Sequence, residues 1–360
     1  LDRGEWAAQP LTRHEGRVIT VQAFLSSTGT TLIVSGGDDG KAKIWSPGAN
    51  PSAATSENRI CSGTIGHTAG NRDQHLPVPE PVRSMAGLTA SQGSRLLAVC
   101  GGGRVRIWDP ERGTVVPARL PEPPGMWDVM TSYRSVGGSS RLVAAARDGG
   151  GEVVAYDPVS GESEVLFPAY SPPQQGSLLP SPPRRERLTA MTSFVGRDGA
   201  VRVVTAWGSA TICVWKATRA TFTAAVRVAG WGEVQALGAA VAPDGTEVVA
   251  AAVRNPEIGL WSLDTGEPWG DPLIGHEEWV QGLTFYRGRD GSVLLASGDE
   301  DGALRIWDPW RRVLLHTILL GLPCRALCVC GEELAVGTDE GFLMLRLTGG
   351  LAVTGAVNGS

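Results

Sequence analysis

A pattern that occurs twice constrains this chain more than any other feature of its sequence. Residues 297–308 read SGDEDGALRIWD, and residues 35–46 read SGGDDGKAKIWS. In each copy an apolar run leads into Asp-Gly, and an alternating run leads out to Trp, as in two strands joined by a tight turn. Asp-Gly suits such a turn because Gly accepts positive φ and Asp hydrogen-bonds its own backbone. The sequence therefore predicts antiparallel strand pairs that recur along the chain.

The aromatic residue that ends this pattern recurs with a base period of about 46 residues and two longer gaps. Its positions are Trp45, Trp108, Tyr156, Trp215, Trp261 and Trp307, and a weaker seventh unit ends near Leu347. Another apolar strand precedes each of them, at 18–24, 82–88, 129–133, 188–194, 234–241, 280–286 and 324–329. Seven units of roughly four strands each follow, in an all-β fold that suits a chain with 48 Gly and 24 Pro.

These residues carry a family resemblance. Gly275-His276, Trp279-Val280, Ser297-Gly298, Asp301-Gly302 and Ile306-Trp307-Asp308 together resemble a WD repeat. The set of units resembles a seven-bladed WD-repeat β-propeller; the first unit matches equally closely, Trp108-Asp109-Pro110 belongs to a third, and the other four are degenerate. The linker at 264–273 is similar in style to actinobacterial members. The resemblance implies a single propeller over residues 1–350 and a C-terminal tail over 351–360.

The two ends of the chain are expected to pair. Residues 2–11 read DRGEWAAQPL and echo the linker DTGEPWGDPL at 264–273, whose second half is expected to be an outer fourth strand. The seventh unit has only three clear strands. We therefore expect the N-terminal strand to complete the last blade and close the ring, which removes two exposed edges. In the alternative interpretation, residues 351–357 form that last strand.

Two insertions, at 68–81 and 168–187, interrupt the period. Both fall between a fourth strand and the next first strand, so the resemblance places them on the same face as the turns between second and third strands. They are either flexible linkers or part of a partner-binding surface.

The resemblance also assigns two hydrogen-bonded tetrads. One consists of His276, Ser297, Asp301 and Trp307, and the other of His14, Ser35, Asp39 and Trp45. A Ser, a His and an Asp resemble a hydrolase triad, but a set that recurs with each repeat is better explained as a structural lock between strands.

Little else in the sequence indicates chemistry. Of five His, three precede a first strand, His316 lies in an apolar run and His75 lies in an insertion. No His/Cys cluster or G-x-S-x-G motif is present, and the glycines at 101–103 replace a tight turn rather than form a phosphate loop. The six Cys show no C-x-x-C pair and mostly lie in apolar strands, which favours free thiols and a reducing cytoplasm. We therefore expect no catalysis, cofactor or metal.

A candidate site follows from aligning the seven first strands. The residue just after the aligned apolar position faces the channel or its mouth, by strand alternation. These residues are Ile19, Arg83, Asp128, Thr189, Gln235, Gln281 and Arg325. Trp231, Trp279, Arg17 and Arg187 precede or adjoin them. Trp and Arg often dominate binding energy at interfaces, so Arg83, Arg325 and Trp279 are predicted to contact an acidic or aromatic ligand; the alternative is that these polar residues only hydrate the channel.

The sequence thus predicts a monomeric, non-catalytic cytoplasmic scaffold that binds a protein or peptide, with no nucleic acid or membrane partner; the net charge of −5 opposes general nucleic-acid binding. Three alternatives stay open. The chain is a regulatory module of a larger bacterial protease, kinase or NTPase, or a propeller enzyme that uses His75, or a nucleic-acid binder that uses Arg184, Arg185 and Arg187.

Overall fold

The computed structural model describes residues 9–10, 14–26, 29–45, 61–66, 80–90, 93–112, 114–117, 127–134, 140–146, 153–167, 188–208, 211–217, 221–227, 232–288, 290–331 and 333–346. Both predicted insertions fall largely outside these residues, as do the tail and the alternative last strand at 351–357. His75, Arg184, Arg185 and Arg187 lie outside them too.

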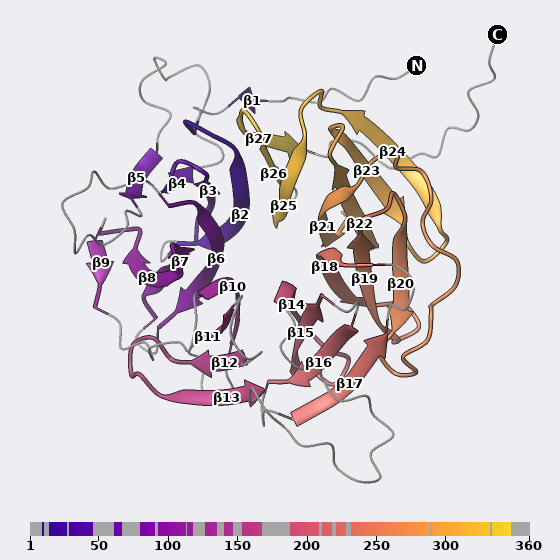
Figure 1. The fold of residues 1–360 in the computed structure, drawn as a ribbon, viewed down its shortest axis with the longest axis horizontal. Coiled ribbons are helices and arrows are strands. Elements are labelled where there is room, and N and C mark those ends of the chain that lie inside the picture. Colours follow the sequence, from indigo (N-terminus) through magenta and orange to yellow (C-terminus); the bar gives the residue numbers. More distant parts are fainter. Residues whose placement is uncertain are drawn as a thin grey trace.

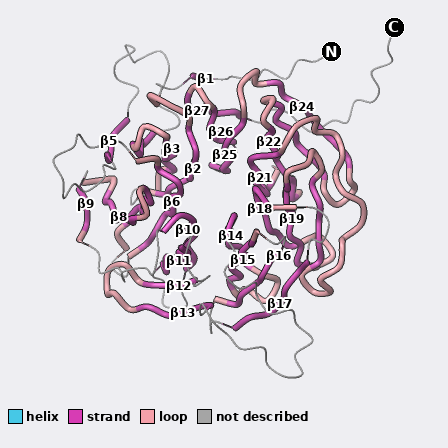
Figure 2. The backbone as a smooth tube through the Cα atoms, viewed as in Figure 1, coloured by secondary structure: helices cyan, strands magenta, loops and turns pink. Residues whose placement is uncertain are grey.

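The described strands form seven antiparallel sheets, and no helix occurs among them (Figures 1 and 2). The first sheet contains β2 (Val18–Leu25), β3 (Thr31–Gly37), β4 (Lys41–Trp45) and β5 (Cys61–Gly66). The second contains β6 (Val82–Thr89), β7 (Arg95–Gly101), β8 (Arg104–Asp109) and β9 (Thr114–Val116). The third contains β10 (Trp127–Arg134), β11 (Ser140–Ala146), β12 (Val153–Tyr156) and β13 (Ser163–Phe167).

The remaining sheets continue this order along the chain. The fourth contains β14 (Leu188–Val195), β15 (Val201–Trp207), β16 (Thr211–Lys216) and β17 (Thr221–Arg227). The fifth contains β18 (Val234–Val241), β19 (Glu247–Val253) and β20 (Ile258–Ser262). The sixth contains β21 (Val280–Arg287), β22 (Val293–Asp299), β23 (Ala303–Asp308) and β24 (Val313–Leu319). The seventh contains β25 (Cys324–Cys330), β26 (Glu333–Thr338), β27 (Gly341–Arg346) and β1 (Gln9–Pro10).

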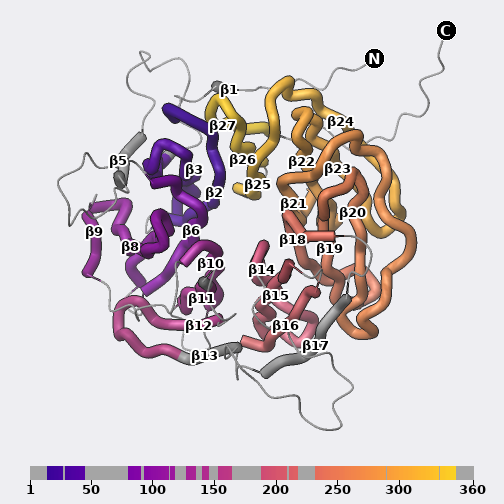
Figure 3. Tube along the Cα trace, in the orientation of Figure 1, coloured from indigo at the N-terminus to yellow at the C-terminus, as the bar shows by residue number. Residues whose placement is uncertain are grey.

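The sheets lie around a common centre in chain order, with the first strand of each sheet innermost (Figures 1 and 3). This arrangement is consistent with the blades of a WD-repeat propeller, and it confirms the predicted all-β fold. The N-terminal strand β1 lies beside the last sheet, where Gln9 pairs with Met344 and Pro10 with Leu343.

Apolar side chains from neighbouring sheets fill the space between them. Between the first and second sheets, Val34 and Ile44 pack with Val82, Leu97 and Trp108, all of them almost fully buried. Similar clusters lie between the other sheets, and Val18 and Ile33 of the first sheet pack with Phe342 of the seventh. Burial of apolar area at about 25 cal/mol per Å² in these layers explains why each unit depends on its neighbours.

Close approach between sheets explains the recurring Ser-Gly. A Cβ at Gly36 would lie 2.4 Å from Val82 Cγ1, and one at Gly298 would lie 2.0 Å from Cys324 Sγ. The second strand of one sheet therefore meets the start of the next first strand at a position where only glycine fits.

Two predicted boundaries need correction. The second half of the linker at 264–273 is not a regular fourth strand: it meets β20 only through isolated bridges, Trp261 to Pro268 and Ile258 to Leu273. Pro268 and Pro272 have no N–H to donate, so a continuous ladder cannot form. The third first strand begins at Trp127 rather than at 129, because a bulge at its start breaks the apolar alternation.

Candidate functional site

The sixth sheet contains a buried polar network centred on His276. Its Nε2 lies 2.6 Å from Ser297 Oγ, which also accepts a hydrogen bond of 2.8 Å from the Trp307 indole N–H. Its Nδ1 lies 2.6 Å from Asp299 Oδ2. The predicted carboxylate, Asp301, is exposed instead. The assignment of Asp301 to the tetrad was therefore wrong, because Asp299 lies opposite Val280 at the end of β22 and reaches the imidazole first.

A cation completes this network. Arg305 Nη1 lies 3.0 Å from Asp299 Oδ2 and 2.8 Å from His276 Nδ1, and all three residues are buried. Burial lowers the pKa of His276 and so favours its neutral form. Burial would raise the pKa of Asp299, but its hydrogen bonds and the Arg305 charge outweigh this, and the pKa falls below its usual value.

The first sheet builds the corresponding network with the predicted residues. His14 Nε2 lies 2.7 Å from Ser35 Oγ, and His14 Nδ1 lies 3.0 Å from Asp39 Oδ1. The side chain of Trp45 lies outside the described residues. Burial opposes ionisation of Asp39, but the hydrogen bond and charge of His14, with two backbone N–H donors, lower its pKa to about 2.

The Ser and His side chains of both networks are buried, and each links an outer segment to the inner strands. Each polar atom that would carry out nucleophilic attack already has a partner inside the sheet. The geometry therefore supports a structural role for both networks rather than a triad that a substrate could reach.

The candidate residues at the channel mouth share a backbone feature that the sequence did not reveal. Each of the seven sheets has a register shift between its first and second strands, and the extra residue is always the one singled out by the alignment. The extra residues are Ile19, Arg83, Asp128, Thr189, Gln235, Gln281 and Arg325. A β-bulge leaves its extra residue unpaired and redirects its side chain. We call these seven positions the bulge residues.

The seven bulges lie at the same end of their sheets, and two contacts join neighbouring sheets at that end. Arg325 of the seventh sheet donates to Glu300 of the sixth, and Trp127 N donates to Gly103 O across the second and third sheets. Each bulge lies at the start of a first strand, opposite the end of a second strand. We call this the bulge end; it also carries the turns from second to third strands.

Two of the predicted arginines are already paired at the bulge end. Arg325 makes a bidentate contact with Asp339, at 2.8 and 3.0 Å, and a third bond of 3.0 Å to Glu300. The paired guanidinium lowers the pKa of the Asp339 carboxyl. Arg17 donates to Asp38 at 2.7 Å. Two internal carboxylates therefore already bind Arg325, and its contact with an acidic or aromatic ligand stays a prediction.

The acidic partners were missed by the sequence reasoning, although a signal for them exists. Asp38, Glu300 and Asp339 each follow directly on a second strand, at the same position of their units. This position faces the bulge of its own sheet and the bulge of the next, as the two contacts of Arg325 show.

Trp279 and the glutamines also lie at the bulge end. Trp279 is 40% exposed, and the Arg254 guanidinium lies 5.8 Å from the centroid of its ring. Arg254 in turn pairs with Glu233 at 3.2 Å. Gln235, Gln281 and Asp128 are half-buried, whereas Arg83 is exposed. Trp231 and Arg187 lie outside the described residues.

Inside the ring the first strands line a cavity of about 400 Å³. Met85, Met130 and Met191 contribute apolar surface, and Ser and Thr hydroxyls on β10 and β14 bond across strands, as between Thr131 Oγ1 and Ser193 Oγ at 3.2 Å. Among the described residues no group of His, Cys, Asp and Glu is arranged to hold a metal ion. In the same residues no helix could span a membrane.

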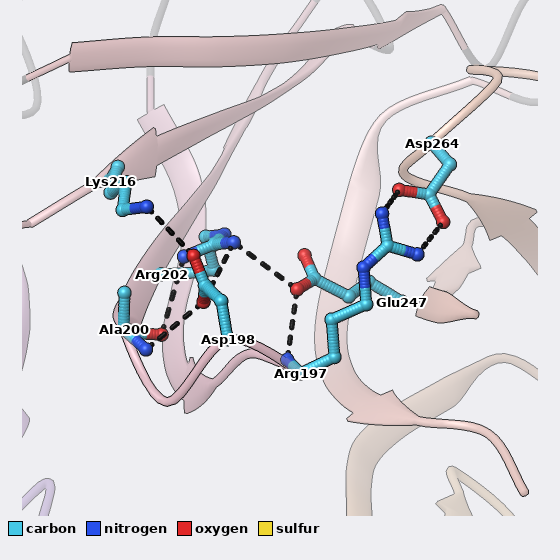
Figure 4. Close-up of polar contacts among 7 residues, drawn as sticks. All are labelled: Arg197, Asp198, Ala200, Arg202, Lys216, Glu247 and Asp264. Carbon is cyan, nitrogen blue, oxygen red and sulfur yellow. Dashed lines mark hydrogen bonds and ion pairs between the residues drawn. The ribbon is translucent and has the colours of Figure 1, made fainter. Parts of the chain in front are cut away.

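The opposite end of the ring carries a different kind of network, between the fourth and fifth sheets (Figure 4). Arg202 Nη2 reaches Glu247 Oε1 at 3.2 Å, and both side chains are largely buried. Arg197 makes two bonds of 2.9 Å to Asp264. These contacts join turns of adjacent sheets.

Comparison with known proteins supports the repeat assignment. The family model described as "WD domain, G-beta repeat" matches residues 8–46, 71–109 and 271–308. Three stretches of this chain are therefore WD repeats. They are the same three units that the sequence identified as recognisable, and the units between them fall outside the match.

The curated relatives match over short segments. Periodic tryptophan protein 2 homolog of Schizosaccharomyces pombe is 40% identical over 92 residues, which cover 26% of this chain and 10% of that protein. Periodic tryptophan protein 2 of Saccharomyces cerevisiae is 35% identical over 112 residues, or 29% and 11%. WD repeat and SOCS box-containing protein 1 of Mus musculus is 39% identical over 61 residues, or 17% and 14%. The matched segments thus span about a tenth of the first two relatives. WD-repeat proteins are generally interaction scaffolds.

Proposed function

We propose that this chain is a closed seven-bladed WD-repeat propeller that acts as a non-catalytic platform and binds a protein or peptide partner at its bulge end. The observation that carries the proposal is the sevenfold repetition of the bulge. It presents one redirected side chain from each sheet at the start of the innermost strand. Pairing of β1 with β27 supports closure, since the same sheet then contains both ends of the ring.

The chemistry of the bulge end suits recognition. It combines exposed Trp279 with arginines, acids and amides on rigid strands, and Trp and Arg are the residues that most often dominate binding energy. Side chains held at strand ends are positioned more firmly than those of long loops. The two His networks, in contrast, are buried and offer no reactive group to a substrate.

Affinity capture with matched variants tests the proposal. One variant combines Trp279→Ala, Gln235→Ala and Gln281→Ala at the bulge end; the control variant replaces Arg197 and Asp264 by Ala at the opposite end. We expect the bulge-end variant to lose proteins that the wild type captures, and the control to retain them. Equal capture by both variants would show that partners bind elsewhere.

A second candidate is a recognition module within a larger protein. The relatives support it, because the segments similar to this chain make up only 10% to 15% of their length. In that case the bulge end would recruit targets for an activity carried by another part of the polypeptide. Sequencing the complete gene distinguishes the two candidates.

A further inference from the structure

Three of the residues at the bulge end are arginines whose surroundings can be compared: Arg17, Arg83 and Arg325. Arg325 and Arg83 occupy the same bulge position, in the seventh and second sheets. The bonds of Arg325 show what such an arginine binds. Its three described bonds all go to carboxylates, one group from its own sheet and one from the preceding sheet.

The second sheet has no acidic residue at the position equivalent to Asp339. The position equivalent to Asp339 is Gly102, which follows directly on β7 and has no side chain. The acid of the preceding sheet is Asp38, and Arg17 already binds it at 2.7 Å. No hydrogen bond or ion pair joins Arg83 to any residue that the structure describes, and its side chain is exposed.

A second cationic residue, Arg104, lies level with Arg83 in the strand register of this sheet. Arg104 pairs with Gly101, which itself lies opposite Val82, the residue before Arg83. Arg104 is also exposed, and within the described part of the chain it has no acidic partner. The carboxylate of Glu80 lies against Gly102, where an added Cβ would be 1.0 Å from its Oε2, and no described ion pair joins it to either arginine.

We propose that Arg83 and Arg104 form the subsite of the bulge end that takes a carboxylate side chain from an acidic segment of the protein partner. The partner's carboxylate would bind the Arg83 guanidinium with the kind of bidentate contact that Asp339 makes with Arg325. This inference rests on the proposed function and specifies the chemistry of its ligand. It also separates the arginines: Arg325 already binds two internal carboxylates, and Arg83 binds none among the described residues.

The most direct test introduces an acidic residue into the chain itself, at position 102. Gly102→Asp places a carboxylate at the position equivalent to Asp339, and Gly102→Asn is its matched control. Both substitutions introduce the same backbone strain at φ +58, which Asp and Asn tolerate better than other residues, and both displace the end of Glu80. Only Asp introduces a charge, so only Asp can satisfy Arg83.

The probe is a labelled peptide with Glu at alternate positions, titrated at low salt and compared with the same peptide carrying Gln. We expect the Glu peptide to bind the wild type and Gly102→Asn alike. Arg83→Gln and Gly102→Asp should each weaken binding by about tenfold or more, the range for loss of a charge-assisted hydrogen bond. Arg197→Gln, at the opposite end of the ring, should leave it unchanged.

Several outcomes overturn the inference. They are equal binding of the Glu and Gln peptides, full binding by Arg83→Gln, and equal losses in the Asp and Asn variants. If the bulge-end triple variant still loses its captured partners while Arg83→Gln binds normally, the proposed function stands and the acidic subsite is wrong. If the triple variant loses no partner, the proposed function fails independently of this peptide.

Discussion

The His networks of the first and sixth sheets both place a carboxylate against a buried histidine, but the carboxylate comes from a different position in each sheet. In the first sheet Asp39 reaches back from the turn to His14, across Gly37. In the sixth, Asp299 occupies the position of Gly37 and contacts His276 directly, and the turn residue Asp301 is left exposed. The strand register is the same in both sheets, because Val18 lies opposite Gly37 and Val280 lies opposite Asp299.

The comparison shows that the fold requires a carboxylate beside the imidazole, and that residues at two different positions can supply it. Both networks also cap the same backbone N–H: Lys41 N donates to Asp39 Oδ1 at 3.1 Å, and Ala303 N donates to Asp299 Oδ1 at 2.7 Å. They differ in burial of charge. Arg305 lies within the sixth-sheet network, whereas Lys43, at the equivalent strand position, takes no described part in the bonds of His14.

The largest effect is expected from Asp299→Ala. Removing this carboxylate leaves Arg305 buried without its described ionic partner, and breaking a buried pair by removing one member costs about 3–5 kcal/mol. Urea unfolding measures the change in the free energy of unfolding. Asp301→Ala is the matched control and should change it by less than about 0.5 kcal/mol, as exposed substitutions do. If Asp301→Ala proves the more damaging of the two, the assignment of the network is wrong.

A smaller effect is expected from Asp39→Ala in the first sheet. The substitution leaves the imidazole of His14 and the N–H groups of Glu15 and Lys41 without the acceptor they share. Only the imidazole of His14 is a buried donor among them; an unsatisfied buried donor costs about 1–3 kcal/mol, and no buried arginine loses its partner here. The control is Asp38→Ala, which removes only an exposed ion pair with Arg17 worth at most about 1 kcal/mol. A loss from Asp39→Ala equal to that from Asp299→Ala would contradict the ranking by buried charge.

The two networks should also respond to acid in different pH ranges. The pKa of His276 is lowered by burial, so its contribution to stability is present above pH 6.5 and is lost as the pH falls below that value. Asp39 has its pKa lowered to about 2 from 3.8, so its contribution is lost only between these values. Unfolding free energies at pH 7.5 and pH 5.5 test this.

Over that range the wild type should lose stability, His276→Gln should lose less, and Asp39→Asn should lose as much as the wild type. Asp39 is ionised in both folded and unfolded chains at pH 5.5, so Asp39 itself takes up no proton between pH 7.5 and pH 5.5. A His276→Gln protein with the same pH dependence as the wild type would remove His276 from the acid response.

The sequence predicted the features that depend on the spacing of the repeats, and it did not predict those that depend on which side chains touch. The spacing of the repeated pattern predicted the seven units, the innermost strands and the residue just after each aligned apolar position, because a repeated core imposes regular spacing. The carboxylate that reaches His276 was not predictable from spacing. Asp299 ends β22 and Asp301 lies in the turn two residues later, and only the structure shows which of them meets the imidazole. The bulges were not predicted either. One extra residue at a strand end redirects the strand and its side chains, but it leaves no mark in the types of residue that form the strand.

The same limit applies to charge pairing at the bulge end. Arg83 and Arg325 occupy equal positions in the sequence pattern and were predicted to act alike. They differ because Gly102 lies at the position equivalent to Asp339 of the last sheet, so only Arg325 has an ionic partner among the described residues. Cross-sheet contacts such as that of Arg325 with Glu300 connect units and therefore do not follow from any one of them.

The comparison can be sharpened by converting one network into the other. A Cβ at Gly37 would lie 2.5 Å from His14 Nδ1 and 2.7 Å from Asp39 Oδ1, so Gly37→Asp alone should destabilise the first sheet. In an Asp39→Ala background the competing carboxylate is absent, and the new side chain can take the role that Asp299 has beside His276. A double-mutant cycle should therefore show a favourable coupling on the order of 1 kcal/mol between positions 37 and 39. Additive losses would mean that the backbone of this turn, and not the vacancy left by Asp39, decides which position can supply the carboxylate.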